Sequence, residues 1–178
     1  MIRGNSGSGK TSVAHEVRRR YGRGCALIEQ DYLRRIVLRE HDSGAPVAPA
    51  FIVDTVRSAL ALGYHAVLEG ILHSRRYRQP LLDLLAGHGG TAAVYYLDIP
   101  FEETVRRHAN RAAHVTFTPE DMRGWYAERD LLGTPGETVI GAASTLDETV
   151  ATILHGSGLA TRAPATPCPV SCPRCAED

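Results

Sequence analysis

The chain has 178 residues, a length typical of a single domain, and its 20 Lys and Arg residues balance its 20 Asp and Glu residues. Without net charge there is no overall positive field to draw the protein to nucleic acid or anionic lipid, so neither partner is expected. No apolar run reaches the roughly 20 residues that span a bilayer, and the cysteines do not form the spread framework of a secreted fold. These features favour a cytoplasmic protein without a membrane span.

Short apolar or β-branched runs alternate with helix-length amphipathic segments from residue 1 to about residue 155, the pattern of a parallel sheet covered by helices. Strands are predicted at residues 1–3, 25–29, 66–69, 92–97 and 138–140. Helices are predicted at residues 10–21, 32–39, 48–62, 75–85, 101–108, 119–129 and 146–154. We therefore expect one α/β domain over residues 1–155, followed by a disordered tail over residues 156–178, which are rich in Pro, Gly and small side chains.

A phosphate-binding loop is predicted between the first strand and the first helix. The sequence there is Gly4-Asn5-Ser6-Gly7-Ser8-Gly9-Lys10-Thr11, which satisfies G-x-x-x-x-G-K-[ST]. The glycines let successive backbone N–H groups turn toward phosphates, and the positive N-terminal end of the next helix adds to the anion site. All of these residues are candidates for binding a nucleotide, with Lys10 reaching the β- and γ-phosphates and Thr11 ligating Mg²⁺.

The strand before this loop is short. Only Met1, Ile2 and Arg3 precede Gly4, whereas a strand usually runs about five residues or more. Either the first strand is unusually short or the natural chain begins upstream of Met1, and the sequence leaves both possibilities open.

The motifs after the loop follow the order found in a known group of kinases. A carboxylate follows the second strand in Ala26-Leu27-Ile28-Glu29-Gln30-Asp31, another ends Val67-Leu68-Glu69-Gly70, and an arginine-bearing helix follows Tyr95-Tyr96-Leu97-Asp98-Ile99-Pro100. In this order residues 1–155 resemble the nucleoside and small-molecule kinases of the P-loop class, which include adenylate, shikimate, gluconate and adenylylsulfate kinases and the chloramphenicol phosphotransferases. The resemblance implies a three-layer α/β fold, a five-stranded parallel sheet of order 2-3-1-4-5, and transfer of the γ-phosphoryl group of ATP·Mg to a hydroxyl of a small molecule such as a nucleoside, a sugar or an antibiotic.

Asp31 takes the place of the acidic residue that lies near the acceptor hydroxyl in this group, and is therefore a candidate catalytic base. Arg34 and Arg35 are candidates for holding the acceptor or the moving phosphoryl group. Asp31 could instead only cap the following helix, because Asp at the start of a helical run is good capping chemistry. Capping and catalysis are compatible.

Glu69 followed by Gly70 resembles the Asp-Gly that ends the corresponding strand of adenylate kinases. A carboxylate at the C-terminal edge of a parallel sheet faces the ligand crevice. Glu69 is therefore a candidate to hold Mg²⁺ through water or to contact the acceptor. The alternative is a structural ion pair with Arg75 or Arg76.

An arginine-bearing lid is predicted at residues 109–119. Arg107 and Arg111 are four residues apart and so share a helical face, and lid arginines can stabilise charge on the transferred group, which makes both candidate catalytic residues. The alternative is a solvated basic face. Residues 41–50 are a further candidate cover for the acceptor, and Thr118 is predicted to cap the helix that begins at Pro119.

Other interpretations remain open. A P-loop ATPase or a nucleotide-dependent switch acting on a protein partner would use the same loop, although the chain lacks the Asn-Lys-x-Asp guanine motif. Phosphorylation of polynucleotide ends would use the same arrangement of Asp and Arg, but the neutral charge disfavours it. Cys168, Cys172 and Cys175 have the spacing of an iron–sulfur motif, yet without an evident fourth ligand we predict no metal there.

Overall fold

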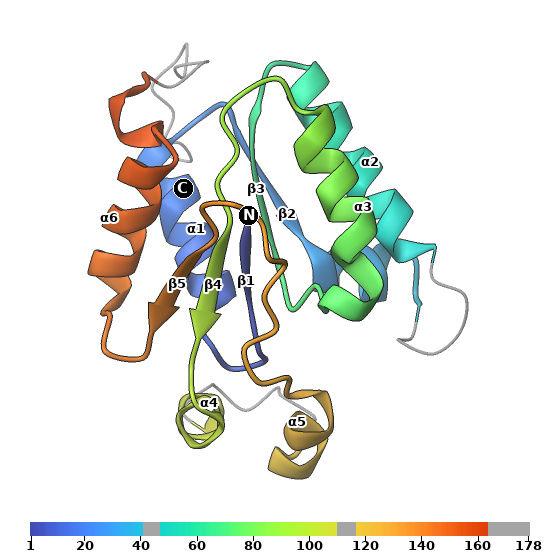
Figure 1. Cartoon of the computed structure of the whole chain (residues 1–178), viewed down its shortest axis with the longest axis vertical. Helices are drawn as coiled ribbons and strands as arrows, with labels where there is room; N and C mark the ends of the chain where they lie inside the picture. Colours follow the sequence, from blue (N-terminus) through green and yellow to red (C-terminus); the bar gives the residue numbers. More distant parts are fainter. Residues whose placement is uncertain (41–46, 110–116, 164–178) are drawn as a thin grey trace.

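The computed structural model describes residues 1–40, 47–109 and 117–163. Five strands form a parallel sheet in the order β2-β3-β1-β4-β5, with helices on both faces (Figure 1). The strands are β1 (Ile2–Gly4), β2 (Cys25–Glu29), β3 (His65–Gly70), β4 (Tyr95–Asp98) and β5 (Thr138–Gly141). The predicted fold class and strand order are therefore confirmed, and β1 is a short central strand paired on both sides.

The helices form at the predicted places, with three differences, one of which is a short helix at Leu159–Thr161 in the segment predicted to be disordered. They are α1 (Lys10–Tyr21), the π-helix η1 (Tyr32–Val37), α2 (Ala48–Ala61), α3 (Ser74–Gly87), α4 (Phe101–Ala109), α5 (Pro119–Trp125), α6 (Leu146–Gly156) and the 3-10 helix η2 (Leu159–Thr161). Thr118 caps α5 as predicted, because its Oγ1 accepts a hydrogen bond from Asp121 N. The helix predicted at residues 119–129 ends at Trp125, since Ala127 bonds to the phosphate loop instead, and the helix predicted at residues 32–39 is a π-helix.

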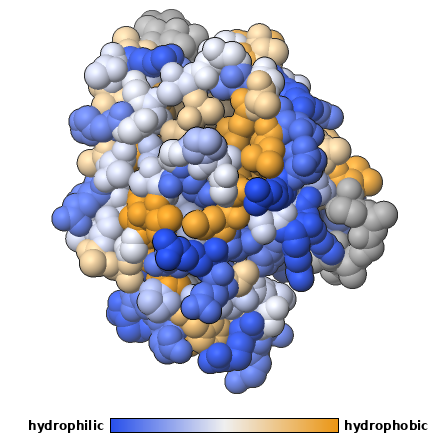
Figure 2. All heavy atoms as spheres, viewed as in Figure 1, coloured by the Kyte–Doolittle hydropathy of each residue, from blue (hydrophilic) through white to orange (hydrophobic). Residues whose placement is uncertain are grey.

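Two apolar cores lie on opposite faces of the sheet (Figure 1). The core under α1 and α6 contains Ile2, Val13, Val17, Leu97, Ile140, Val150 and Ile153. The core under α2 and α3 contains Ile28, Ile52, Val56, Leu68, Tyr77, Leu81 and Leu84. Each such side chain stabilises the fold by about 1.5–3 kcal/mol when it is fully buried. α4 and α5 lie beyond the carboxyl ends of the strands, and that end of the molecule is largely hydrophilic in the view of Figure 2.

The chain stays packed beyond residue 155. Tyr21 Oη donates a hydrogen bond to Ala163 O at 3.1 Å, and η2 packs on α6. The first part of the predicted tail therefore lies against the domain, and residues 164–178 fall outside the described residues. Within the described part of the chain, no helix combines the length and the apolar character needed to cross a membrane.

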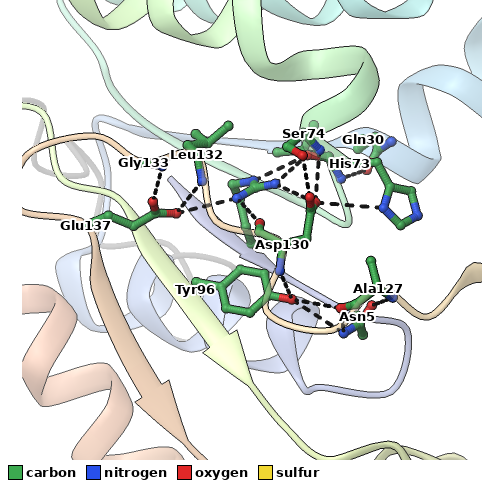
Figure 3. A network of polar contacts seen from close by, with 12 residues as sticks. Asn5, Gln30, His73, Ser74, Tyr96, Ala127, Asp130, Leu132, Gly133 and Glu137 are labelled. Carbon is green, nitrogen blue, oxygen red and sulfur yellow. Dashed lines mark hydrogen bonds and ion pairs between the residues drawn. The ribbon is translucent and has the colours of Figure 1, made fainter.

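A buried guanidinium joins β1 to two loops that are distant in sequence (Figure 3). Arg3 is fully buried and donates hydrogen bonds to Leu72 O at 2.8 Å and to Asp130 O at 2.7 Å. Its Nη2 also pairs with Asp130 Oδ2 at 2.9 Å, and its Nη1 with Glu137 Oε1 at 3.4 Å. One side chain thus fixes two loops relative to the central strand.

The two carboxylates carry this connection further (Figure 3). Asp130 accepts hydrogen bonds from Ser74 N at 2.9 Å and from Ser74 Oγ, so it fixes the first residue of α3. Burial raises the pKa of Asp130, but nearby His73, hydrogen bonds from Ser74 and the charge of Arg3 outweigh it and hold this pKa well below its usual range. Glu137 accepts from the backbone N–H groups of residues 132 and 133. The network therefore holds the start of α3 and the loop that contains Asp130 and Glu137 in place relative to β1.

We expect Arg3→Met to lower the free energy of unfolding by about 3–5 kcal/mol, because the substitution leaves two carboxylates in the interior without their cation. Urea denaturation followed by circular dichroism measures the loss. Arg19→Met is the control, since it removes an exposed arginine paired with Glu16 and should lower the free energy of unfolding far less than Arg3→Met does. Equal losses in the two variants would contradict the role of Arg3.

Candidate functional site

Residues 4–9 connect β1 to α1 by a turn that requires glycine. A Cβ added at Gly4 would lie 2.7 Å from Leu97 O, and one added at Gly7 would lie 2.5 Å from Thr104 O, so backbone atoms exclude side chains there. No side chain caps the N–H groups in the first turn of α1. Uncapped N–H groups at the positive end of a helix form an anion site, as the sequence motif predicts.

Lys10 is the only lysine in the sequence, and its side chain folds back over this turn. Its Nζ donates a hydrogen bond to Asn5 O at 2.9 Å, and the side chain is buried. An ammonium group held over such a turn can neutralise the charge of a β- or γ-phosphate.

Thr11 and Glu69 place oxygen ligands beside Lys10. Thr11 Oγ1 donates a hydrogen bond to Glu69 Oε1 at 3.2 Å. Burial raises the pKa of Glu69, and the charge of Lys10 partly opposes the rise. Mg²⁺ takes hydroxyl, carboxylate and phosphate oxygens as ligands, so the pair fits a magnesium ion next to the loop. Among the described residues, no three His, Cys, Asp or Glu side chains are grouped as metal ligands.

The side chain of Asn5 anchors the loop. Its Nδ2 donates to Ala127 O at 2.9 Å, and Ala127 N donates to its Oδ1 at 3.0 Å. Tyr96 Oη accepts from Asn5 Nδ2 and donates to Ala127 O (Figure 3). The side-chain amide of Asn5 therefore holds the segment that follows α5.

Arg107 on α4 contacts the loop from the side of β4. Its Nη1 donates to Ser8 O at 3.1 Å, and its Nε pairs with Glu103 Oε1 at 2.7 Å. The predicted arginine is thus placed against the phosphate loop rather than on a solvated face. Arg111 lies outside the described residues, as do most of the predicted lid at residues 109–119 and residues 41–46 of the predicted acceptor cover.

Two cavities meet at the phosphate loop. The donor-side cavity, on the side of β5 and α4, has a volume of 480 Å³, and its lining includes Gly9, Leu97, Arg107, Ile140 and Thr149. The catalytic cavity, on the side of β2 and β3, has a volume of 600 Å³, and its lining includes Lys10, Thr11, Asp31, Arg35 and Glu69. Ser6 and Gly7 line this cavity as well, so the structure brings seven of the predicted site residues to it.

Asp31 is exposed at this cavity and pairs with Arg34 Nη2 at 3.1 Å. Its backbone is already helical and its side chain makes no capping hydrogen bond, so the capping alternative is wrong for this residue. An exposed carboxylate beside a cavity can accept a proton from a bound hydroxyl.

The acceptor-side wall contains residues that the sequence analysis did not assign to the site. A third cavity of 570 Å³, here called the arginine cavity, adjoins the catalytic cavity and shares Asp31 and Arg35 with it. Its lining also includes Arg34, which the sequence analysis did assign to the site, and the unassigned residues Arg39, Arg75, Arg76, His73, Phe117 and Trp125. The basic run that follows β3 could have indicated this wall, because chain segments at the carboxyl edge of a parallel sheet meet at the ligand crevice.

The fold and the loop together define a P-loop nucleotide-binding domain. The chain belongs to the AAA domain family, whose model matches residues 1–127.

Similar solved structures include three kinases. The first is a sugar kinase from Janibacter sp. HTCC2649, with 19% identity, a TM-score of 0.65 and an alignment that covers 89% of this chain and 93% of that chain. The second is the APS kinase CysC of Mycobacterium tuberculosis in complex with AMPPNP and APS, with 20% identity, a TM-score of 0.65 and coverage of 90% of this chain and 95% of that chain. The third is a gluconokinase from Sinorhizobium meliloti 1021, with 22% identity, a TM-score of 0.61 and coverage of 90% of each chain. The comparison with curated proteins finds no match. At these identities the likeness shows that the fold is shared.

We expect Glu69→Gln to raise the thermal unfolding temperature of the nucleotide-free protein at neutral pH. Folding raises the pKa of Glu69, so the stability that its protonated form contributes is present below the unfolded pKa and is lost as pH rises through the folded pKa. The difference in unfolding temperature between the variant and the parent protein should therefore vanish as the pH falls toward about 4. Thermal unfolding from neutral to acid pH measures this trend, and a difference that stays constant would contradict it.

Proposed function

We propose that the protein is a kinase that transfers the γ-phosphoryl group of ATP·Mg to a hydroxyl of a small molecule. The observation that carries the proposal is the position of the phosphate loop between two cavities, with Gly9 and Arg107 lining one and Lys10 and Asp31 the other. A donor nucleotide and an acceptor would then occupy separate spaces that meet at the loop. Transfer to an acceptor needs both spaces, whereas nucleotide hydrolysis needs one.

The donor-side cavity suits a purine ring. Its walls include Leu97, Ile99 and Ile140 and the small residues at 141–144, which offer packing surface and backbone groups. The triphosphate would extend from this cavity along the loop and bring its β- and γ-phosphates to Lys10. We assign ATP from the resemblance to the kinase group, and the similar APS kinase structure holds AMPPNP.

In the proposed reaction the acceptor oxygen bonds to the γ-phosphorus, the bond from that phosphorus to the bridging oxygen breaks, and ADP leaves. Asp31 takes the proton of the acceptor hydroxyl. Lys10 and Arg107 stabilise the negative charge on the transferred group. Magnesium bound by Thr11, and by Glu69 through water, would supply further charge neutralisation when present.

ADP formation from ATP·Mg tests the proposal across nucleosides, sugars, polyols and hydroxylated antibiotics, with the mass of each acceptor followed. Acceptor-dependent ADP formation, with a gain of one phosphoryl group on the acceptor, is the expected result. The names of the similar structures, which include a sugar kinase and a gluconokinase, support this choice of panel. Phosphate release that no acceptor stimulates would favour the alternative, an ATPase or a switch with a protein partner.

Lys10 can be tested with a covalent probe, because the sequence contains no other lysine. An amine-reactive acyl-phosphate derivative of ATP should label Lys10, as read by peptide mapping, and ATP·Mg should protect it. Lys10→Ala should lower kcat/KM by about 100-fold or more, because charge neutralisation at the phosphates is lost. Label confined to the N-terminal amine and unaffected by ATP would refute this assignment.

Asp31→Asn should lower kcat by about 100-fold through loss of the base while leaving the Kd for ATP·Mg within about two-fold. Asp54→Asn on α2 is the matched control, because Asp54 is also an exposed aspartate paired with an arginine three residues later, Arg57. Stopped-flow or steady-state assays with an accepted substrate give kcat, and calorimetry gives the Kd. Full activity in Asp31→Asn would remove Asp31 from the proposed mechanism.

A further inference from the structure

The arginine cavity concentrates positive charge beside the proposed acceptor position. Five arginines line its 570 Å³: Arg34, Arg35 and Arg39 from η1 and the residues that follow it, and Arg75 and Arg76 from α3. The residue before α3, His73, also lines the cavity, so the positive end of this 14-residue helix lies at the same place. This concentration contrasts with the neutral charge of the whole chain.

Among the described residues, two carboxylates line the same cavity, and both are engaged. Asp31 pairs with Arg34, and Glu40 Oε2 accepts a hydrogen bond from Ala48 N at the start of α2, 3.2 Å away. In the described part of the cavity wall, five guanidinium groups therefore lie with two carboxylates, so the described lining carries more positive than negative charge. A bound anion would offset that excess.

The arginine cavity is continuous with the catalytic cavity. Ser6, Asp31, Arg35, Ile71 and Phe117 line both of them. A single small molecule can therefore reach Asp31 with one group and the arginines with another.

We infer that the acceptor carries, besides its hydroxyl, a phosphate ester group that the arginines of this cavity bind. The inference rests on the proposed function, because it names the substrate class of the same site. A guanidinium offers paired N–H donors that match phosphate oxygens, and the double charge of a phosphate monoester matches the excess better than the single charge of a carboxylate. The acceptor is thus a phosphorylated alcohol, with the hydroxyl at Asp31 and the phosphate ester at the arginines.

Acceptors that differ only in the anionic group test this inference: glucose, gluconate and glucose 6-phosphate, with ribose and ribose 5-phosphate as a second series. We expect kcat/KM to be at least about tenfold higher for the phosphate esters than for the neutral members. Faster transfer to the neutral sugars or to gluconate would overturn the inference while leaving the kinase proposal in place.

Variants on both walls of the cavity locate the effect. Arg35→Gln and Arg75→Gln should each raise KM for the phosphate ester by about tenfold while changing kcat and the Kd for ATP·Mg less than about two-fold. Arg78→Gln is the matched control, since Arg78 is exposed on the same helix as Arg75 but does not line the cavity. Equal effects of Arg75→Gln and Arg78→Gln would overturn the assignment.

Calorimetry with inorganic phosphate separates this inference from the proposed function. The phosphate loop is first saturated with a non-hydrolysable ATP analogue and Mg²⁺, so that added phosphate can report only a second anion site. Phosphate binding that Arg35→Gln and Arg75→Gln weaken supports the site even if no tested acceptor is phosphorylated. No phosphate binding to the loaded protein would overturn it, whatever the turnover assays show.

Discussion

The buried guanidinium of Arg3 is the interaction on which the placement of the site depends. Arg3 directly precedes the phosphate loop and bonds to Leu72 O and to Asp130. A guanidinium holds its donors in a fixed plane, so this side chain sets two loops relative to β1 at once. Asp130 then fixes Ser74, where α3 begins beside the proposed acceptor position. Arg3 in the central strand therefore holds both the proposed donor side and the proposed acceptor side of the site in place.

Local sequence was enough to predict the order of the elements, the phosphate loop and the strand ends that carry Asp31 and Glu69. These features depend on short-range periodicity and on a motif whose glycines have a steric reason. The contacts of Arg3 with Asp130 and Glu137 span 127 and 134 residues, and no local pattern marks such pairs. The same reason explains the early end of α5, because its continuation is set by a bond from Ala127 to Asn5. The arginine cavity needed the fold, since its walls come from η1 and α3.

Charge in this protein is local rather than global. The chain is neutral overall, yet its only lysine sits at the phosphate loop and five arginines line one cavity beside it. Glu69 is buried beside Lys10 and Thr11, where burial makes its charge costly and a bound cation would relieve that cost. This distribution suits a site that takes anionic substrates and a divalent ion. The proposed kinase activity therefore depends on a few buried or cavity-lining charges.

The central claim is that donor and acceptor occupy their two cavities at the same time and that the phosphoryl group passes directly between them. Initial velocities measured while ATP·Mg and an accepted substrate are varied together test this claim most directly. Direct transfer within a ternary complex predicts double-reciprocal lines that intersect. Parallel lines, or ATP turnover at a rate independent of the acceptor concentration, would contradict it.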